Sequence, residues 1–299
     1  MGQTYAMHNR FSGPVGKIVM SGRKLFPIES NPSEDYPLII AIHGGSYTST
    51  YFDLPGYSLI ERAAALRIPI IAVDRPGYGD TTGFSPKEAT IANNAERLDR
   101  AIGELWRCHG GNAAGVFLVG HSIGGAITVS IAARRPSWPL LGISVSGVGL
   151  VTPSESGDAW AALPDIPMID LPAPLKDQVM YGPEWTVGRT MPAVGHQADA
   201  PCPRAELIDI TSTWHDAVRP TAARVQVPVH YRQAEFDRLW IVDADQVHGF
   251  GAAFSASPLV DAALYRDAGH CIDFHRLGPA FQTEQLAFAL RCCLQRPAG

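Results

Sequence analysis

The sequence lacks long apolar runs. Among its 299 residues, no apolar stretch approaches the ~20 residues of a membrane-spanning helix. The first residues, MGQTYAMHNRFSGPVG, also lack the basic region followed by an apolar region that marks a secretory signal. We therefore expect a soluble, unsecreted, cytoplasmic protein without a membrane span.

Cysteine is scarce, and the cysteines are not spaced as metal ligands. Their number is odd, and the set is Cys108, Cys202, Cys271, Cys292 and Cys293. This pattern favours reduced structural thiols over a disulfide framework or a metal site. The single Asn-x-Ser pattern, Asn31-Pro32-Ser33, carries the middle proline that excludes glycosylation.

Clustered basic residues are absent as well. The 24 Lys and Arg residues are scattered and are outnumbered by 29 Asp and Glu residues, which gives a formal net charge of −5. Nucleic-acid binding requires Lys and Arg gathered on one face, so we expect no nucleic-acid partner. A chain that is 46% hydrophobic and 18% charged is typical of one large globular domain, and its oligomeric state is left open.

What the sequence does contain is an alternation of buried strands and helices. After a predicted hairpin over 15–28, continuous apolar runs predict strands at 38–45, 68–80, 116–120, 140–149, 227–234 and 259–267. Helical spacing lies between them, at 58–67, 87–108, 123–135, 206–218 and 279–294. Apolar runs that do not alternate with polar residues indicate strands buried on both faces. The fold class is therefore α/β, with a mostly parallel sheet flanked by helices.

The alternation fails between residues 151 and 205. This stretch holds nine prolines and shows no clear periodicity, which inside a compact domain is typical of functional or disordered segments. Its Trp and Met residues argue against disorder. We predict a core formed by 1–150 and 206–299, with 151–205 inserted as a cap or lid. Deleting 155–203 should alter substrate range more than the reactivity of the core.

A serine between glycines breaks the strand and helix of VFLVGHSIGGAITV. On its own, Ser122 could simply cap the following helix. However, four further segments occur in a fixed order at the ends of predicted strands: IIAIHGGSY, VDRPGYGDTTG, VPVHYRQAEFDRLW and YRDAGHCIDFH. Together the five segments resemble the α/β-hydrolase superfamily over nearly the whole chain except the cap. The resemblance implies an eight-stranded sheet and a reaction that needs neither metal nor organic cofactor.

The resemblance also implies a catalytic triad. Ser122 takes the position of the nucleophile, Asp237 that of the acid and His270 that of the base, in the family's chain order. Other carboxylates remain possible for the acid, namely Glu235, Asp243, Asp245 and Glu155. His275 is the alternative base, and His43, His121 and His248 are expected to be structural or pocket-lining.

Two backbone amides are expected to form the oxyanion hole. They are those of Gly45, with Ser46 as the alternative, and Ile123. Aromatic and methionine residues near these positions could line an apolar pocket or only seat the cap on the core. The residues with this expected role, together with one histidine beside the nucleophile, are Tyr47, His121, Trp160, Met180 and Trp185.

The predicted function is that of a carboxylesterase-like serine hydrolase. It would cleave a carboxylic ester of a medium-sized apolar or aromatic small molecule through an acyl-enzyme. A thioesterase or lactonase in small-molecule biosynthesis is the alternative enzyme. A ligand-binding receptor that keeps the fold is the alternative from another class.

Overall fold

A computed structural model describes residues 9–27, 35–83 and 85–294, so the Asn31-Pro32-Ser33 pattern lies outside the described residues. Its main sheet has eight strands. Their spatial order is β1 (Asn9–Val15), β2 (Ile18–Leu25), β4 (Ile70–Val73), β3 (Leu38–Ile42), β5 (Val116–His121), β6 (Leu140–Ser146), β9 (Val229–Ala234) and β10 (Val260–Tyr265). The six strands β4, β3, β5, β6, β9 and β10 pair in parallel, whereas the β1–β2 hairpin joins the edge of β4 antiparallel. The predicted mostly parallel, eight-stranded sheet is confirmed.

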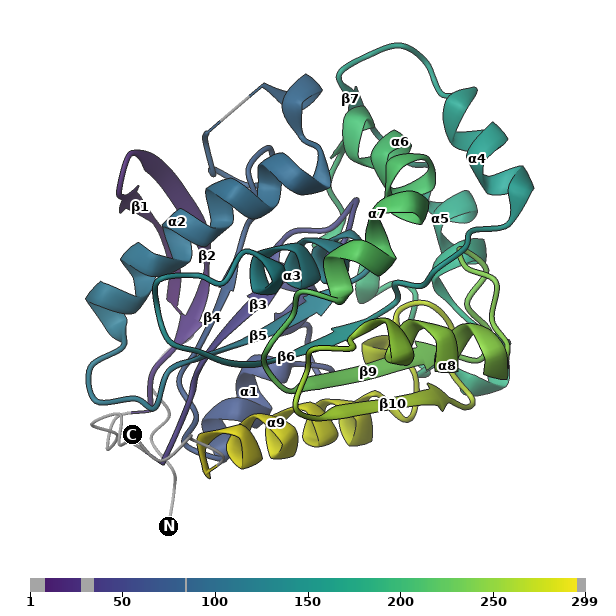
Figure 1. Cartoon of the computed structure of the whole chain (residues 1–299). Helices are drawn as coiled ribbons and strands as arrows, with labels where there is room; N and C mark the ends of the chain where they lie inside the picture. The colour runs from purple at the N-terminus through teal and green to yellow at the C-terminus, as the bar shows by residue number, and fades with distance from the viewer. Residues whose placement is uncertain (1–8, 28–34, 84, 295–299) are drawn as a thin grey trace.

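Helices cover both faces of this sheet (Figure 1). One face packs against α1 (Leu59–Ala65) and α9 (Gly278–Leu294), and the other against α2 (Ile91–His109), α3 (Ile123–Ala133) and α8 (Ala244–Ala253). Strand β3 shows why its sequence is continuously apolar. Leu38, Ile40 and Ile42 enter the core on the α2 and α3 side, while Ile39 and Ala41 enter the core on the opposite side.

Three local predictions differ from the structure. The hairpin predicted over 15–28 begins earlier, at Asn9, because its edge strand NRFSGPV contains the Gly and Pro that disguise a strand. The helix predicted over 206–218 is two helices, α6 (Arg204–Thr211) and α7 (Thr213–Ala222). The Ser212 hydroxyl donates to Ile208 O at 2.7 Å. It thus competes with backbone N–H groups for a helix carbonyl at the residue between the two helices. Helix α8 has no counterpart in the prediction.

The stretch between β6 and α6 contains short elements. They are α4 (Ser154–Ala161), β7 (Met168–Ile169), α5 (Ala173–Met180), η3 (Glu184–Thr186), η4 (Gly195–Ala198) and β8 (Cys202–Pro203), with β7 and β8 paired antiparallel. Figure 1 shows α4 and α5 gathered with α6 in one group, apart from α1 and α9. No residue of α4 is fully buried, whereas α5 buries Lys176 and Met180.

Two kinds of feature are absent from the described part of the chain. Within residues 9–27, 35–83 and 85–294, no helix is long and apolar enough to cross a bilayer. Over the same ranges, no three His, Cys, Asp or Glu side chains are grouped as metal ligands. The five cysteines are thiols rather than disulfides, and all but Cys108 are buried.

Candidate active site

The carboxyl ends of the parallel strands meet at one edge of the sheet. Ile42 pairs with Gly120, and His121 pairs with Ser146, so β3, β5 and β6 end side by side. The chain leaves β3 toward β4 on one side and later returns to β5 on the other. Such a reversal in an open α/β sheet is where ligands bind. The loops after β3, β5, β9 and β10 all open at this edge, and they carry the residues that the sequence singled out.

Ser122 occupies a strained turn between β5 and α3. Its backbone has φ 56° and ψ −126°, a conformation that non-glycine residues rarely adopt and that tends to occur at functional sites. The turn requires glycine on both sides of Ser122, because neighbouring atoms leave no room for a Cβ atom at either position. A Cβ atom on Gly120 would lie 2.3 Å from Thr128 Oγ1, and one on Gly124 would lie 2.2 Å from Ile42 O. The Ser122 side chain makes no capping hydrogen bond, so it does not serve as an ordinary helix cap.

His270 and Asp237 form a buried pair. His270 Nδ1 lies 2.8 Å from Asp237 Oδ2, and both side chains are fully buried. The same carboxylate accepts hydrogen bonds from Gln233 Nε2 at 2.8 Å and from Leu239 N at 2.9 Å. An ionised carboxylate only accepts, so the shared proton lies on Nδ1 and leaves Nε2 of the neutral ring as an acceptor.

The free nitrogen of His270 is buried and has no hydrogen-bond partner among the described residues. Its ring centroid lies 4.9 Å from that of His121, the residue just before Ser122. A buried polar atom without a partner calls for an explanation, and a base that waits for a proton from a neighbouring hydroxyl is one.

The alternative carboxylates have other places. Glu235 accepts from Asp267 N at 3.0 Å, and Asp243 caps α8 by accepting from Gln246 N at 2.7 Å. Asp245 is exposed in the first turn of that helix, and Glu155 is exposed on α4. Among the candidates, Asp237 is the carboxylate that bonds His270.

His275 is a structural link rather than a second base. Its Nδ1 donates to Cys271 O at 2.8 Å, and its Nε2 accepts from Gly269 N at 2.8 Å and from Gly182 N at 3.0 Å. The ring thereby ties the loop that carries His270 to the segment after α5. Protonation of Nε2 would place a third donor against two N–H donors and break this link.

We expect the protein to lose stability as the pH falls from about 6.5 toward 4, in part through His275. Burial lowers the pKa of His275 from 6.5 to about 4. Between these values the unfolded chain binds a proton that the folded chain does not, so stability present above pH 6.5 is lost as the pH falls through about 4. At ~1.4 kcal/mol per pKa unit, the loss is about 3 kcal/mol.

Urea unfolding at steps between neutral pH and about 4 measures this loss. His275→Gln is the matched variant, because its amide oxygen can accept the same N–H groups without titrating. The free energy of unfolding should therefore fall less steeply with acid in this variant than in the parent. Equal slopes would show that His275 is not the group responsible.

The loop after β3 carries the first candidate oxyanion donor. Ser46 N donates to Tyr78 Oη at 3.2 Å, so this amide is already occupied. Gly45 lines the same cavity as Ser122 and Ile123. Ile123 is the first residue of α3, and its N–H therefore has no acceptor within the helix. Gly45 and Ile123 are thus the better placed pair of amides.

A buried ion pair between Arg75 and Glu206 holds the backbone of this loop. Arg75 donates to His43 O at 2.9 Å and to Gly44 O at 3.0 Å, and its guanidinium bonds both oxygens of Glu206 at 2.7 and 3.0 Å. Both side chains are 0% exposed. Burial opposes the charge on Arg75, but Glu206 outweighs it and raises the pKa of Arg75 above its ordinary value. The segment VDRPGYGDTTG did not suggest a role for Arg75, and its partner Glu206 lies 131 residues away in the sequence.

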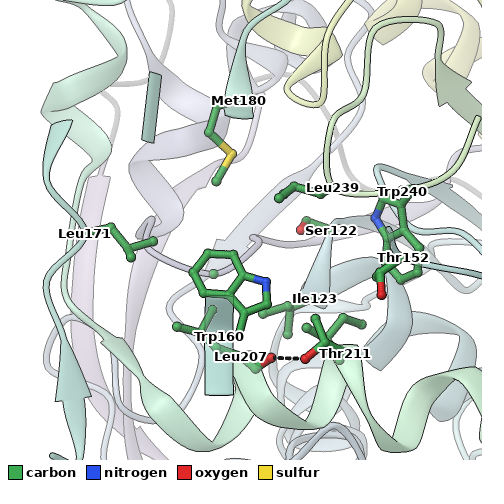
Figure 2. A pocket seen from close by; sticks show the side chains of 12 residues that line it. Ser122, Ile123, Thr152, Trp160, Leu171, Met180, Leu207, Thr211, Leu239 and Trp240 are labelled. Atoms are coloured by element: carbon green, nitrogen blue, oxygen red, sulfur yellow. Dashed lines mark hydrogen bonds between the residues drawn. The ribbon is translucent and has the colours of Figure 1, made fainter. Parts of the chain in front are cut away.

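A small apolar pocket opens in front of Ser122 (Figure 2). It is lined by Gly45, Ser122, Ile123, Thr152, Trp160, Leu171, Met180, Leu207, Ile210, Thr211, Leu239 and Trp240, none of which is charged.

Three other polar side chains of the lining are already bonded within the protein. Thr152 Oγ1 lies 3.0 Å from His215 Nε2, Thr211 donates to Leu207 O, and Trp240 Nε1 donates to Gly147 O. Such a pocket suits an uncharged apolar group.

Two of the five residues expected at the pocket line it, namely Trp160 and Met180. Tyr47 is buried against Tyr51 and Phe274, outside the pocket. His121 lies behind the serine, stacked on Tyr51 at 4.7 Å, and burial holds its pKa well below the ordinary value. Trp185 is 56% exposed and lies in a separate surface groove.

Sequence reasoning missed several pocket residues that it had within reach. Leu239 and Trp240 come two and three residues after Asp237 in the segment VPVHYRQAEFDRLW, and both line the cavity. Leu207, Ile210 and Thr211 share one face of α6, at helical spacing, within or beside the helix predicted over 206–218.

A model of the "Alpha/beta hydrolase family" matches residues 39–278. Among curated proteins, protein phosphatase methylesterase 1 of Pongo abelii is 27% identical over 128 residues, or 43% of this chain. That match spans 31% of the methylesterase, so the chain matches about a third of the length of this relative. The corresponding mouse protein is 28% identical over the same length.

Solved structures resemble the whole chain. A putative lipase from Acinetobacter baumannii AYE superposes with a TM-score of 0.66 at 14% identity, over 97% of this chain and 93% of the lipase. The 2-hydroxy-6-oxo-6-phenylhexa-2,4-dienoate hydrolase of Rhodococcus sp. strain RHA1 gives 0.64 at 17% identity, over 94% and 100%. At such identities the likeness concerns the fold.

Proposed function

Because this chain belongs to the alpha/beta hydrolase family, we propose that it is a serine esterase whose nucleophile is Ser122. One observation carries the proposal: a serine in a strained turn faces an apolar pocket, and a carboxylate-held histidine lies nearby with its second nitrogen unbonded. Each of these features costs folding free energy, and nucleophilic catalysis accounts for them together.

In the proposed mechanism, Ser122 Oγ attacks the carbonyl carbon of the ester while His270 Nε2 takes the hydroxyl proton. Asp237 keeps the proton on Nδ1 and stabilises the imidazolium. The N–H groups of Gly45 and Ile123 bind the oxygen that becomes negative. His270 then gives its proton to the leaving alcohol, and water hydrolyses the acyl-enzyme by the same route.

The lining of the pocket supports an apolar acyl or aromatic ester. Its lining offers no charged side chain to a carboxylate, phosphate or ammonium group. We assign 151–205 as the cap over this pocket, because Trp160, Leu171 and Met180 contribute to its lining on the side away from Trp240 and Thr152 (Figure 2). The next helix, α6, contributes three further residues to the lining.

Intact-protein mass after brief treatment with a fluorophosphonate tests the proposal without knowledge of the substrate. One adduct per chain is expected in the parent, and none in Ser122→Ala. Asp237→Ala and His270→Ala should label much more slowly, provided that each variant folds. A parent that fails to label with either a large or a small reagent would contradict the proposal and favour a ligand-binding role.

The bond that is cleaved is tested with matched acyl donors. An ester, a thioester and a lactone that share one apolar acyl group should give the highest kcat/KM for the ester. A thioester or lactone that is turned over at least tenfold faster would place the activity in the alternative enzyme class.

We expect Trp160→Ala to shift the acyl preference toward longer chains. Trp160 is the residue of α4 that lines the pocket, and α4 has no fully buried residue, so the substitution removes contacts with substrate more than with the core. The ratio of kcat/KM between long and short acyl p-nitrophenyl esters should rise about tenfold, because one or two methylenes of contact differ by ~1 to 3 kcal/mol.

Trp185→Ala is the matched control for this substitution. It removes the same side chain from the neighbouring segment, but from an exposed groove outside the pocket. Its acyl preference should equal that of the parent. If both variants shifted the ratio equally, or if neither did, Trp160 would not be a specificity residue.

A further inference from the structure

Lys176 on α5 is buried although it carries a charge. Its side chain is 2% exposed, and its Nζ lies 2.7 Å from Ser46 O, 2.5 Å from Asp199 Oδ1 and 3.5 Å from the centre of the Tyr47 ring. Burial lowers the pKa of Lys176, while the bond to Asp199 opposes that change. A buried ammonium is costly, and an apolar side chain would seat α5 equally well. The cation therefore calls for a role beyond packing.

The atom that Lys176 holds belongs to the candidate oxyanion loop. Ser46 follows Gly45 and has φ 57°, a strained conformation for a residue with a side chain. Both of its backbone groups are bonded: the N–H donates to Tyr78 Oη, and the carbonyl accepts from Lys176 Nζ and from Ala200 N at 3.1 Å. The loop is thus held by Arg75 on the Gly44 side and by Lys176 on the Ser46 side.

We propose that Lys176 is a positioning residue of the oxyanion hole. Its ammonium keeps Ser46 in the left-handed conformation that aims the Gly45 N–H into the pocket beside Ile123. This inference rests on the proposed function. Lys176 does not line the pocket, so it acts through Ser46 and does not touch the substrate.

The arrangement connects the cap to the reaction. Helix α5 supplies both Met180 to the pocket lining and Lys176 to the oxyanion loop. The anion that retains the ammonium, Asp199, follows η4 in the same inserted segment. On this proposal, the oxyanion hole is complete when α5 packs against the loop that carries Ser46. A substrate that contacts Met180 and favours this packing would also complete the oxyanion hole.

The test is Lys176→Met, which fills a similar volume without charge or donors. In ester hydrolysis, kcat should fall about 10- to 100-fold while KM stays within about twofold, because a misaimed oxyanion donor weakens the transition state and not the bound substrate. Affinity for an aryl trifluoromethyl ketone, whose adduct with Ser122 carries the oxyanion, should fall in the same proportion. Affinity for the uncleaved amide analogue of the substrate should not change.

Asp177→Asn is the matched control, because it removes a charge from the same helix. Asp177 pairs with His196 at 2.9 Å, and both side chains are partly exposed. It should leave kcat, KM and ketone affinity as in the parent.

The outcomes separate the two proposals. A parent that is not labelled by fluorophosphonate and does not hydrolyse esters overturns the proposed function, and the role of Lys176 with it. A parent that is active, with Lys176→Met unchanged in kcat, overturns the positioning role alone. If Lys176→Met does not fold, Asp199→Asn decides, since Asp199 is 30% exposed and its loss is tolerated more easily. This variant should lower kcat about three- to tenfold at constant KM, and an unchanged kcat would overturn the role.

Discussion

Ser122→Ala is expected to lower kcat for ester hydrolysis by about 10⁴-fold or more, the largest loss of activity among the single substitutions considered. The substitution removes the atom that forms the acyl-enzyme and leaves the pocket and its oxyanion amides in place. Steady-state hydrolysis of a p-nitrophenyl ester with an apolar acyl group measures it. KM should change little, because the hydroxyl contributes little to binding the ground state.

The double variant Ser122→Ala with His270→Ala separates catalysis from general damage. Groups that act as one unit are not additive, so the second substitution should lower the residual rate by less than about threefold. Ser130→Ala is the control on the same helix, since its hydroxyl only donates to Ala126 O at 2.9 Å. A double variant whose losses multiply would contradict a nucleophile and base that act together.

Arg75→Met is expected to give the largest loss of stability. It leaves the Glu206 carboxylate uncompensated in a site with 0% exposure and removes the donors to His43 O and Gly44 O. Breaking a buried pair by removing one partner costs about 3 to 5 kcal/mol. Urea unfolding followed by tryptophan fluorescence gives the free energy of unfolding.

Two further variants test the physical reason. Arg75→Met combined with Glu206→Leu removes both charges, and should be more stable than Arg75→Met alone, because the uncompensated charge is gone. Arg134→Met breaks a partly exposed pair with Asp99 at 3.4 Å and should cost less than about 1 kcal/mol. If Arg75→Met cost no more than Arg134→Met, the buried pair would not hold the loop.

The parts of the fold that the sequence predicted well are those set by burial on both faces. A run such as Leu38–Ile42 has no polar position because each face of its strand meets a layer of helices. The edge strand Asn9–Val15 lacks that constraint and was harder to recognise. Helix α8, with the sequence ADQVHGFGAA, contains two glycines and few apolar positions, so its pattern is weak until Val247 and Phe250 are seen packed in the core.

The candidate site divides in the same way. Residues that follow strand ends, such as Ser122 and His270, could be proposed because parallel strands end at one edge. Tyr47 and Trp185 were expected to line the pocket because they lie close in sequence to pocket residues. Their side chains point elsewhere, because neighbouring residues along a chain point to different sides of it. The pairing of Arg75 with Glu206 could not be predicted, since nothing in either local pattern indicates a partner 131 residues away.

The expectation that deletion of residues 155–203 would alter substrate range more than reactivity changes with the structure. Cys271 N donates to Met180 O at 3.0 Å, and Thr48 N donates to Ala198 O at 2.9 Å. The second half of the segment thus bonds directly to the loops that carry His270 and Gly45. Its removal would affect the reactivity of Ser122 as well as substrate range.

These backbone bonds also limit how the molecule can be recombined with its relatives. A foreign loop grafted between Val151 and Pro167 would leave these bonds and the pairing of β7 with β8 intact, and would exchange Trp160 in the pocket lining. A graft that extends through Met180 to Ala198 would have to rebuild hydrogen bonds to the loops that carry His270 and Gly45 at once. The segment is therefore two units in engineering terms: a replaceable first part that we expect to select the substrate, and a second part inherited together with the core.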